Sequence, residues 1–105
     1  MAFDVTITEE AETHLNDLPR KDQRAIESGI HRRLTNQPEK TTKAIKKLRQ
    51  NPFAQYELRT GKFRVLYNVD TEKHEVTVLL VGTKKGNKLI VKGKEFHGHK
   101  DNPPA

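Results

Sequence analysis

Alternating apolar and polar residues mark two neighbouring strands in the middle of the chain, at residues 56–60 and 63–67. A period of two is typical of strands that bury one face. Gly61 and Lys62 stand between the two runs. Glycine suits the first position of a type II′ turn, because that position needs a positive φ. The pattern therefore predicts an antiparallel hairpin with a two-residue turn.

A two-residue turn also fixes which residues of the hairpin stand opposite one another. One face is then almost entirely apolar, and we expect it to be buried. Its predicted pairs are Tyr56 with Tyr67, Leu58 with Val65, and Thr60 with Phe63.

The other face of the hairpin sets Arg59 directly opposite Arg64, with Glu57 and Gln55 beside them. Like charges placed opposite each other destabilise a sheet by roughly 0.2–1 kcal/mol, so the pairing asks for an explanation. Two explanations are possible. In the first, the two arginine side chains bind a phosphate or another anion. In the second, the face is solvated and Glu57 bridges the two arginines. The hairpin alone leaves both open.

The N-terminal part predicts a short strand followed by a helical hairpin. Residues 3–7 alternate, and Thr8 can cap a helix whose first turn is acidic. Pro19 interrupts this helix. A second helical stretch, residues 21–35, carries a buried stripe on one face and arginines on the other, and it ends before Pro38.

Beyond the second helix, residues 40–50 are interpreted as a basic connector. Residues 76–81 are apolar on both faces, which predicts a central strand that ends at Gly82 and leads into a basic loop. Residues 88–92 predict a short edge strand guarded by lysines. We therefore expect an α+β fold, with an N-terminal strand and a helical hairpin packed on a small antiparallel sheet. A single domain is predicted for residues 1–96, with a flexible tail at 97–105.

Composition narrows the function. The 105 residues include no cysteine, which excludes disulfides and thiol nucleophiles and favours a reducing compartment. No apolar run is long enough for a membrane span and no signal-peptide pattern is present, so we expect a cytoplasmic protein without a membrane partner. The formal net charge is +6, although residues 1–28 carry seven acids and only three bases. The basic remainder points to a polyanion or an acidic partner.

The candidate chemistry is a cationic cluster on the sheet, and we expect no metal or other cofactor. Cations can stabilise the pentacoordinate phosphate formed when an RNA 2′-hydroxyl attacks its own phosphodiester. The reaction also needs a base, for which Glu57 is a candidate, and an acid, for which the tail histidines His97 and His99 are candidates. The predicted phosphate-binding residues around the cluster are Lys62, Lys85, Lys43, Lys46, Lys47 and Arg49.

Two stretches resemble the RelE/ParE toxin superfamily of type II toxin–antitoxin systems. The first, residues 56–67, has a leucine–arginine pair, a glycine turn, and then aromatic–Arg–two apolar–Tyr. The second, residues 78–85, is an apolar strand that ends in Val-Gly-x-Lys. The similarity covers about residues 3–92, and the RelE-like branch matches better than the ParE-like branch.

The resemblance implies a toxin that cleaves mRNA in a ribosome-dependent, metal-independent way and so blocks translation. Arg64 matches a catalytic arginine of the RelE-like branch, Lys84 stands where that branch has another, and Arg59 matches a basic position. The implied partners are mRNA on the ribosome and a cognate antitoxin whose acidic or amphipathic segment covers the basic surface. A toxin–antitoxin hetero-oligomer is expected.

The sequence also departs from the RelE-like pattern at three positions. Gln55 and Glu57 stand where that branch has two lysines, and Ile90 stands near the place of its C-terminal tyrosine. Related branches use a C-terminal histidine instead, which makes His97 a candidate. The alternatives are a ParE-like inhibitor of DNA gyrase and a catalytically degenerate toxin that only binds its antitoxin.

Overall fold

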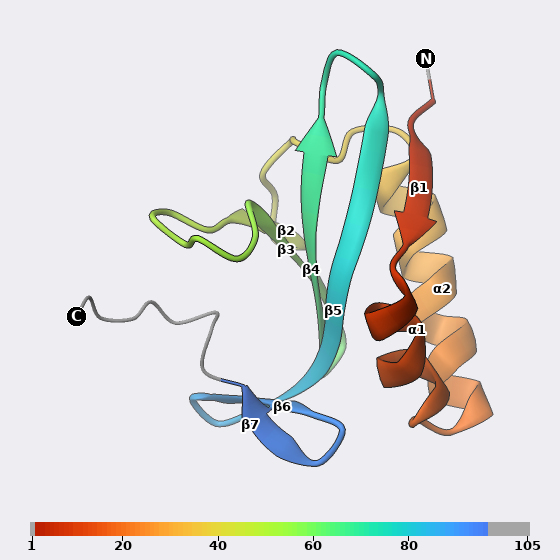
Figure 1. Ribbon diagram of the computed structural model, residues 1–105, viewed down its shortest axis with the longest axis vertical. Helices are drawn as coiled ribbons and strands as arrows, with labels where there is room; N and C mark the ends of the chain where they lie inside the picture. Colours follow the sequence, from red (N-terminus) through yellow and green to blue (C-terminus); the bar gives the residue numbers. More distant parts are fainter. Residues whose placement is uncertain (1, 97–105) are drawn as a thin grey trace.

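The computed structural model describes residues 2–96 of the chain as one mixed sheet with two helices on one face (Figure 1). The predicted α+β fold, with its N-terminal strand and helical hairpin, is confirmed. The predicted tail at 97–105 and its histidine His97 lie outside the described residues. The elements in chain order are β1 (Asp4–Ile7), α1 (Glu9–Asn16), α2 (Arg20–Leu34), β2 (Ile45–Lys47), β3 (Tyr56–Thr60), β4 (Phe63–Asp70), β5 (Glu75–Lys85), β6 (Lys88–Val91) and β7 (Lys94–Phe96).

The sheet runs in the order β2-β3-β4-β5-β6-β7, and β1 pairs in parallel with the first half of β5. All the other neighbouring strands are antiparallel. The predicted hairpin has the expected register, with Tyr56 opposite Tyr67 and Leu58 opposite Val65. Gly61 has a φ of 60°, the positive value that the turn requires. The central position predicted for residues 76–81 is also confirmed, because this stretch lies in β5, which has β4 along one side and β1 and β6 along the other.

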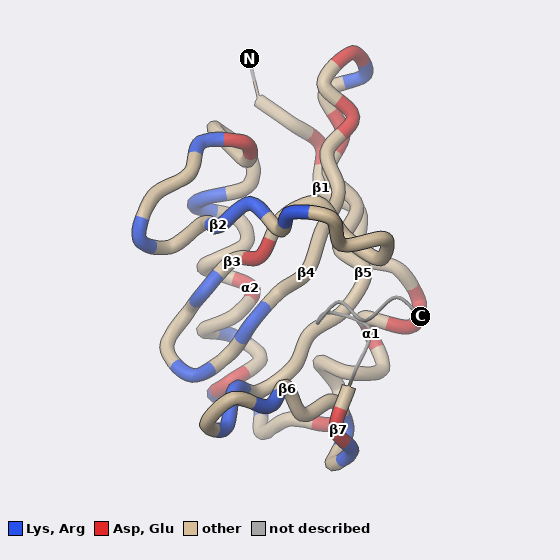
Figure 2. Tube along the Cα trace, turned by 90° about the vertical axis from the view of Figure 1, so that its left-hand side faces the viewer, with Lys and Arg blue, Asp and Glu red and all other residues tan. Residues whose placement is uncertain are grey.

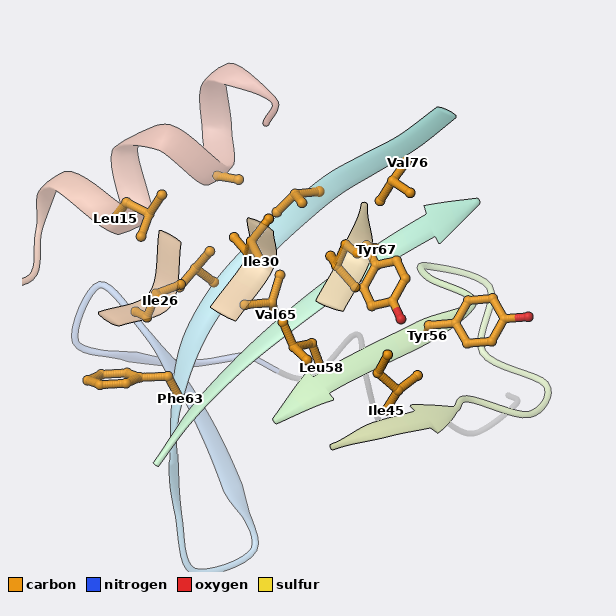
Figure 3. Close-up of a cluster of buried hydrophobic side chains, with 14 residues drawn as sticks. Leu15, Ile26, Ile30, Ile45, Tyr56, Leu58, Phe63, Val65, Tyr67 and Val76 are labelled. Carbon is orange, nitrogen blue, oxygen red and sulfur yellow. The ribbon is translucent and has the colours of Figure 1, made fainter. Parts of the chain in front are cut away.

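Both helices pack on the apolar face of the sheet, α1 beside β5 and α2 against β3 (Figures 1 and 3). The side chain of Thr8 caps α1 by accepting a hydrogen bond from the backbone N–H of Ala11, 3.1 Å away. Burial of aliphatic and aromatic side chains between the helices and the sheet stabilises the layer packing. Figure 3 shows this core, to which the helices contribute Leu15, Ile26 and Ile30 and the sheet contributes Ile45, Tyr56, Leu58, Phe63, Val65, Tyr67 and Val76.

The second face of the sheet also carries a small apolar cluster, formed by Ala54, Leu66, Leu80 and Leu89. The β6–β7 hairpin and the segment before β3 pack against it through Phe53 and Phe96, whose rings meet edge to face at 5.2 Å. The face that carries Arg59 and Arg64 is therefore partly covered rather than fully solvated.

Three predictions about the edges of the sheet were wrong. Residues 45–47 of the expected connector form the edge strand β2, which pairs with β3. Gly82 does not end its strand, because β5 continues to Lys85. A Cβ at Gly82 would lie 2.9 Å from the carbonyl oxygen of Ile90, so the missing side chain lets β6 approach β5 closely. Residues 88–91 form a strand but not an edge, since β7 pairs outside them.

One stretch of β5 lies between its pairings with β1 and with β6, and α1 covers it there. The backbone N–H of Val81 donates a hydrogen bond of 3.2 Å to Nδ1 of His14, which is buried. An unpaired buried N–H would be costly, so the imidazole completes the strand edge. Burial lowers the pKa of His14; Lys92 acts in the same direction and Glu10 opposes it. No helix within residues 2–96 is long and apolar enough to cross a membrane.

Candidate nucleic-acid interface

The predicted pair of guanidiniums lies on the sheet face that points away from the helices. Arg59 of β3 and Arg64 of β4 stand directly opposite each other. Figure 2 looks onto this face, where blue segments follow one another along β2, β3, β4 and the turn between β3 and β4. The hairpin register thus brings two positive charges together on one open side of the sheet.

The Arg64 side chain is held at the hairpin turn by the backbone. Its Nη1 donates hydrogen bonds of 2.9 Å each to the carbonyl oxygens of Gly61 and Phe63. Its Nε is buried and has no hydrogen-bond partner among the described residues. A buried donor without an acceptor costs about 1–3 kcal/mol, so an anion that accepted this hydrogen bond would relieve that cost.

Arg59 is oriented by a different group. Its Nε lies 3.5 Å from Oε1 of Glu57, which is two residues earlier on the same face. The Glu57 side chain is only 7% exposed, whereas the Arg59 side chain is 43% exposed. The carboxylate therefore holds the base of the guanidinium while its outer edge faces solvent. Among residues 2–96 Glu57 forms no ion pair with Arg64, so the interpretation in which it bridges both arginines is not realised.

Lys84 joins the two arginines from the neighbouring strand. Arg64 pairs with Gly82, and alternation along β5 places Lys84 on the same face as Gly82. The backbone N–H of Lys84 donates a 2.8 Å hydrogen bond to the carbonyl oxygen of Lys62, which ties the end of β5 to the turn. Lys85, the next residue, points to the opposite side by the same alternation.

The basic segment around β2 divides between the two faces of the sheet. Lys46 pairs with Glu57 and therefore shares its face, whereas Lys47 pairs with Tyr56 and shares the opposite one. Lys43 precedes the strand and Arg49 follows it, and both are exposed. Of this predicted phosphate-binding run, the register brings Lys46 beside the cluster formed by Arg59, Arg64 and Lys84.

Gln55 has a structural task. Its Oε1 accepts a 2.7 Å hydrogen bond from the backbone N–H of Val69, and its own N–H donates one of 2.7 Å to Oδ1 of Asn68. These bonds join the start of β3 to β4. Gln55 stands where the resemblance implies a catalytic lysine, and in this chain its side chain stabilises the pairing of β3 with β4. Within residues 2–96 no three His, Asp or Glu side chains are grouped closely enough to hold a metal ion.

Sequence reasoning missed a second group of cationic residues, which surrounds a pocket at the start of β2. A pocket of about 240 Å³ lies between the end of α2 and the loop that leads to β2. The sequence predicts arginines on the exposed face of this helix. Arg32 and Arg33 approach Lys40, however, only because of the path that the loop after α2 takes. The residues that line the pocket are Arg32, Arg33, Asn36, Gln37, Lys40, Thr42 and Ile45.

Several solved structures of RelE toxins and RelE–RelB complexes have the same fold as this chain. The chain is 26% identical to a chain of the toxin–antitoxin complex RelBE2 from Mycobacterium tuberculosis, with a TM-score of 0.70, over 80% of this chain and 100% of that one. It is 24% identical to a chain of the archaeal RelE–RelB complex from Pyrococcus horikoshii, with a TM-score of 0.66, over 83% and 99% of the two chains.

The isolated RelE toxin from E. coli shares the fold as well, with 23% identity, a TM-score of 0.62, and coverage of 80% of this chain and 86% of that one. No protein-family model and no curated protein sequence matches the chain. The fold supports a toxin role of the type II kind. Together with the hairpin motif and its register, these structural matches identify the chain as a member of the RelE/ParE toxin superfamily.

Proposed function

We propose that the protein is the toxin of a type II toxin–antitoxin system and that it cleaves mRNA on the ribosome without a metal ion. The observation that carries the proposal is the pair Arg59 and Arg64, opposite each other on an open sheet face. Two backbone carbonyl oxygens hold the Arg64 guanidinium at this face. Arginine forks match the geometry of phosphate oxygens.

The reaction that this surface supports is attack of an RNA 2′-hydroxyl on the adjacent phosphorus. A bond from the 2′-oxygen to phosphorus forms and the bond to the 5′-oxygen breaks, which leaves a cyclic phosphate and a free 5′-hydroxyl. Negative charge grows on the two non-bridging oxygens in the transition state. Arg64, Arg59 and Lys84 are proposed to donate hydrogen bonds to those oxygens, and each such donor can raise the rate by about 10²–10³-fold.

Two proton transfers complete the reaction. Glu57 is proposed as the base that takes the 2′-hydroxyl proton, and His97 as the acid that protonates the leaving 5′-oxygen. The burial of Glu57 beneath Arg59 gives the carboxylate a second task, since it orients the guanidinium. The residues proposed to hold the flanking phosphates are Lys46, which shares the face of the cluster, and Lys62, Lys43, Lys85, Lys47 and Arg49 around it.

The proposed protein partner is an antitoxin. The RelBE2 and archaeal RelE–RelB structures are complexes of this kind. An acidic or amphipathic segment of the partner would neutralise the same basic face that takes RNA, so binding of the two would be mutually exclusive. A toxin–antitoxin hetero-oligomer built on a single folded domain of residues 1–96 follows from this proposal.

One observation favours a second candidate, a toxin that does not cleave RNA. The side chain of Gln55 bonds the sheet, and Glu57 is an acid where the RelE-like branch has a lysine. Two cations that the branch uses are therefore replaced in this chain. A protein that retained only Arg59, Arg64 and Lys84 could bind an anionic partner without catalysing cleavage.

Primer extension on a reporter mRNA, after incubation with purified protein in the presence or absence of ribosomes, separates these functions. The proposal predicts discrete cuts only in the ribosome-containing reaction, and cuts that persist in a chelator. Intact mRNA in a preparation that still arrests growth on expression would favour the non-cleaving toxin. An induced DNA-damage response with normal translation would instead indicate action on gyrase.

A further inference from the structure

The pocket between α2 and β2 is lined by polar and positive side chains. Arg32 and Arg33 enter it from the last turn of α2, and Lys40 enters it from the connecting loop. Figure 2 shows blue segments continuing from the hairpin across β2 onto this loop. The pocket, of about 240 Å³, is large enough for a tetrahedral anion with its first water molecules.

The loop that forms one wall of the pocket is fixed to the core. Tyr67, which is fully buried, donates a 2.6 Å hydrogen bond from its hydroxyl to the carbonyl oxygen of Pro38. The backbone N–H of Lys40 donates to the carbonyl oxygen of Gln37 at 3.2 Å, and that of Thr42 donates to Ile45 at 2.9 Å. The wall is therefore preorganised, so a ligand would not have to order it.

Thr42 places a hydroxyl donor in the pocket wall. Its Oγ1 accepts hydrogen bonds from the backbone N–H groups of Ala44 and Ile45, at 3.0 and 3.2 Å. An oxygen that already accepts two hydrogen bonds has its own proton left to donate. The hydroxyl therefore favours an acceptor, such as a phosphate oxygen, over a donor.

The charges around the pocket select an anion. Within residues 2–96, Arg32, Arg33 and Lys40 have no carboxylate within 4.0 Å. The acid next to Lys40, Glu39, accepts a hydrogen bond from the Thr71 hydroxyl instead. The negative end of the α2 dipole attracts positive side chains, which explains why Arg32 and Arg33 occur in its last turn. It does not explain Lys40 or the hydroxyl of Thr42 in the pocket wall.

A larger pocket of about 450 Å³ between α1 and the β6–β7 hairpin lacks this selectivity. Glu10 and Glu95 line it together with Lys92 and Lys94, and most of its remaining wall is apolar. Opposite charges at one rim do not favour either sign of ligand. The contrast indicates that the uniform charge of the smaller pocket is a property of that site.

We propose that the pocket formed by Arg32, Arg33, Lys40 and Thr42 binds a backbone phosphate of the RNA, away from the cleaved bond. The proposal rests on the proposed function, and it extends the RNA path across the edge of the sheet. Ile45 lines the pocket at the start of β2, and Lys46, the next residue, lies on the face of the cluster. A strand that crosses β2 can therefore contact both sites.

A charge-matched pair of variants tests the proposal. Arg32→Ser/Arg33→Ser removes two cations from the pocket, and Lys21→Ser/Arg24→Ser removes two from the same helix outside it. Binding to RNAs with 2′-O-methyl groups, which cannot be cut, is measured by fluorescence anisotropy for oligomers of about four and about twelve nucleotides. Unfolding curves of both variants verify that each remains folded.

The proposal predicts that the pocket variant binds the longer RNA about tenfold more weakly than wild type. Its plot of log affinity against log salt should be shallower by about 0.7, the equivalent of one single-strand phosphate contact. The helix control and the short RNA should each change less than about twofold. An equal loss in both variants, or no binding of the longer RNA by wild-type protein, would overturn the proposal.

Two further measurements separate the outcomes. If inorganic phosphate alone shifts the amide signals of Asn36 and Thr42 in NMR spectra, while the longer RNA does not, the pocket is a site for free phosphate and the RNA proposal is wrong. Cleavage by the pocket variant is measured on programmed ribosomes in parallel. Normal RNA binding by the pocket variant with intact cleavage would reject this inference while leaving the proposed endonuclease in place.

Discussion

Arg59 and Arg64 face each other in register across the β3–β4 hairpin, yet each is held by a different partner. The Nε of Arg59 lies 3.5 Å from a carboxylate oxygen of Glu57. The Nη1 of Arg64 donates to two carbonyl oxygens at the hairpin turn. Among residues 2–96 no side chain bridges the two guanidiniums by a hydrogen bond or an ion pair.

Replacing Tyr67 by Phe should destabilise the fold by about 1–3 kcal/mol, because the buried carbonyl of Pro38 would lose its hydrogen bond. Tyr56→Phe is the matched control, since its ring stacks on Tyr67 at 5.5 Å but its hydroxyl makes no hydrogen bond among residues 2–96. The free energy of unfolding of each variant is measured by urea denaturation. Equal stability losses would show that the Pro38 bond is unimportant.

Gly82→Ala should destabilise the sheet by about 1–3 kcal/mol, because the added Cβ would lie 2.9 Å from the carbonyl oxygen of Ile90. The Cβ added by Gly29→Ala, in α2, would lie 3.4 Å from the Thr60 hydroxyl and 3.6 Å from its Cβ, which are milder contacts. This substitution should be neutral or stabilising by up to about 1 kcal/mol through helix propensity. Thermal unfolding ranks the two. A Gly82→Ala protein as stable as wild type would contradict the close approach of β6.

Stability should fall as the pH drops below about 6.5. The pKa of His14 is lowered in the fold, chiefly by burial, so the unfolded chain binds the proton more readily. The stabilisation by neutral His14 is complete above the unfolded pKa and is lost as the pH falls toward the folded pKa. His14→Gln keeps an acceptor for the Val81 N–H but does not titrate. Urea midpoints that decline equally in both proteins between pH 7.5 and 5 would disprove this role.

Glu57→Gln should lower the rate of mRNA cleavage by about 10²–10⁴ if the carboxylate is the base. An amide oxygen can still accept a hydrogen bond from Arg59, so the fold and the RNA affinity should change little. Cleavage at a near-normal rate by this variant would show that Glu57 only orients Arg59.

The hairpin could be predicted from sequence because a two-residue turn leaves a single register. Gly61 set the turn, and the alternation of Tyr56 and Leu58 with Glu57 and Arg59 set the faces. Helix boundaries followed from the Thr8 cap and from Pro19. Turns, caps and alternation of this kind depend on residues close together in the sequence, so sequence patterns were sufficient to predict these elements.

The edges of the sheet could not be predicted in the same way. β2 has only three residues, two of them lysines, and its pairing with Glu57 depends on a loop anchored by Tyr67. The extension of β5 past Gly82 depends on β6 folding back onto it. The turn between β6 and β7 did leave a signal, since Gly93, with a φ of 82°, suits a tight hairpin.

The candidate site was likewise predictable only in part. The register placed Arg59 and Arg64 together, but the orphaned Nε of Arg64 and the burial of Glu57 depend on side-chain packing. The selection of Lys46 over Lys47 depends on the pairing of β2. The pocket at Arg32, Arg33 and Lys40 required the path of a loop that sequence patterns do not define.

The most direct test of the central claim compares Arg64→Ala with Arg24→Ala in ribosome-dependent mRNA cleavage. Arg64 is held on the cluster face, whereas Arg24 is an exposed cation of α2, which packs on the other face of the sheet. Arg64→Ala should lower the cleavage rate by at least about 10²-fold, and Arg24→Ala should lower it less than about threefold. A folded Arg64→Ala protein that cleaves mRNA as fast as wild type would contradict the account.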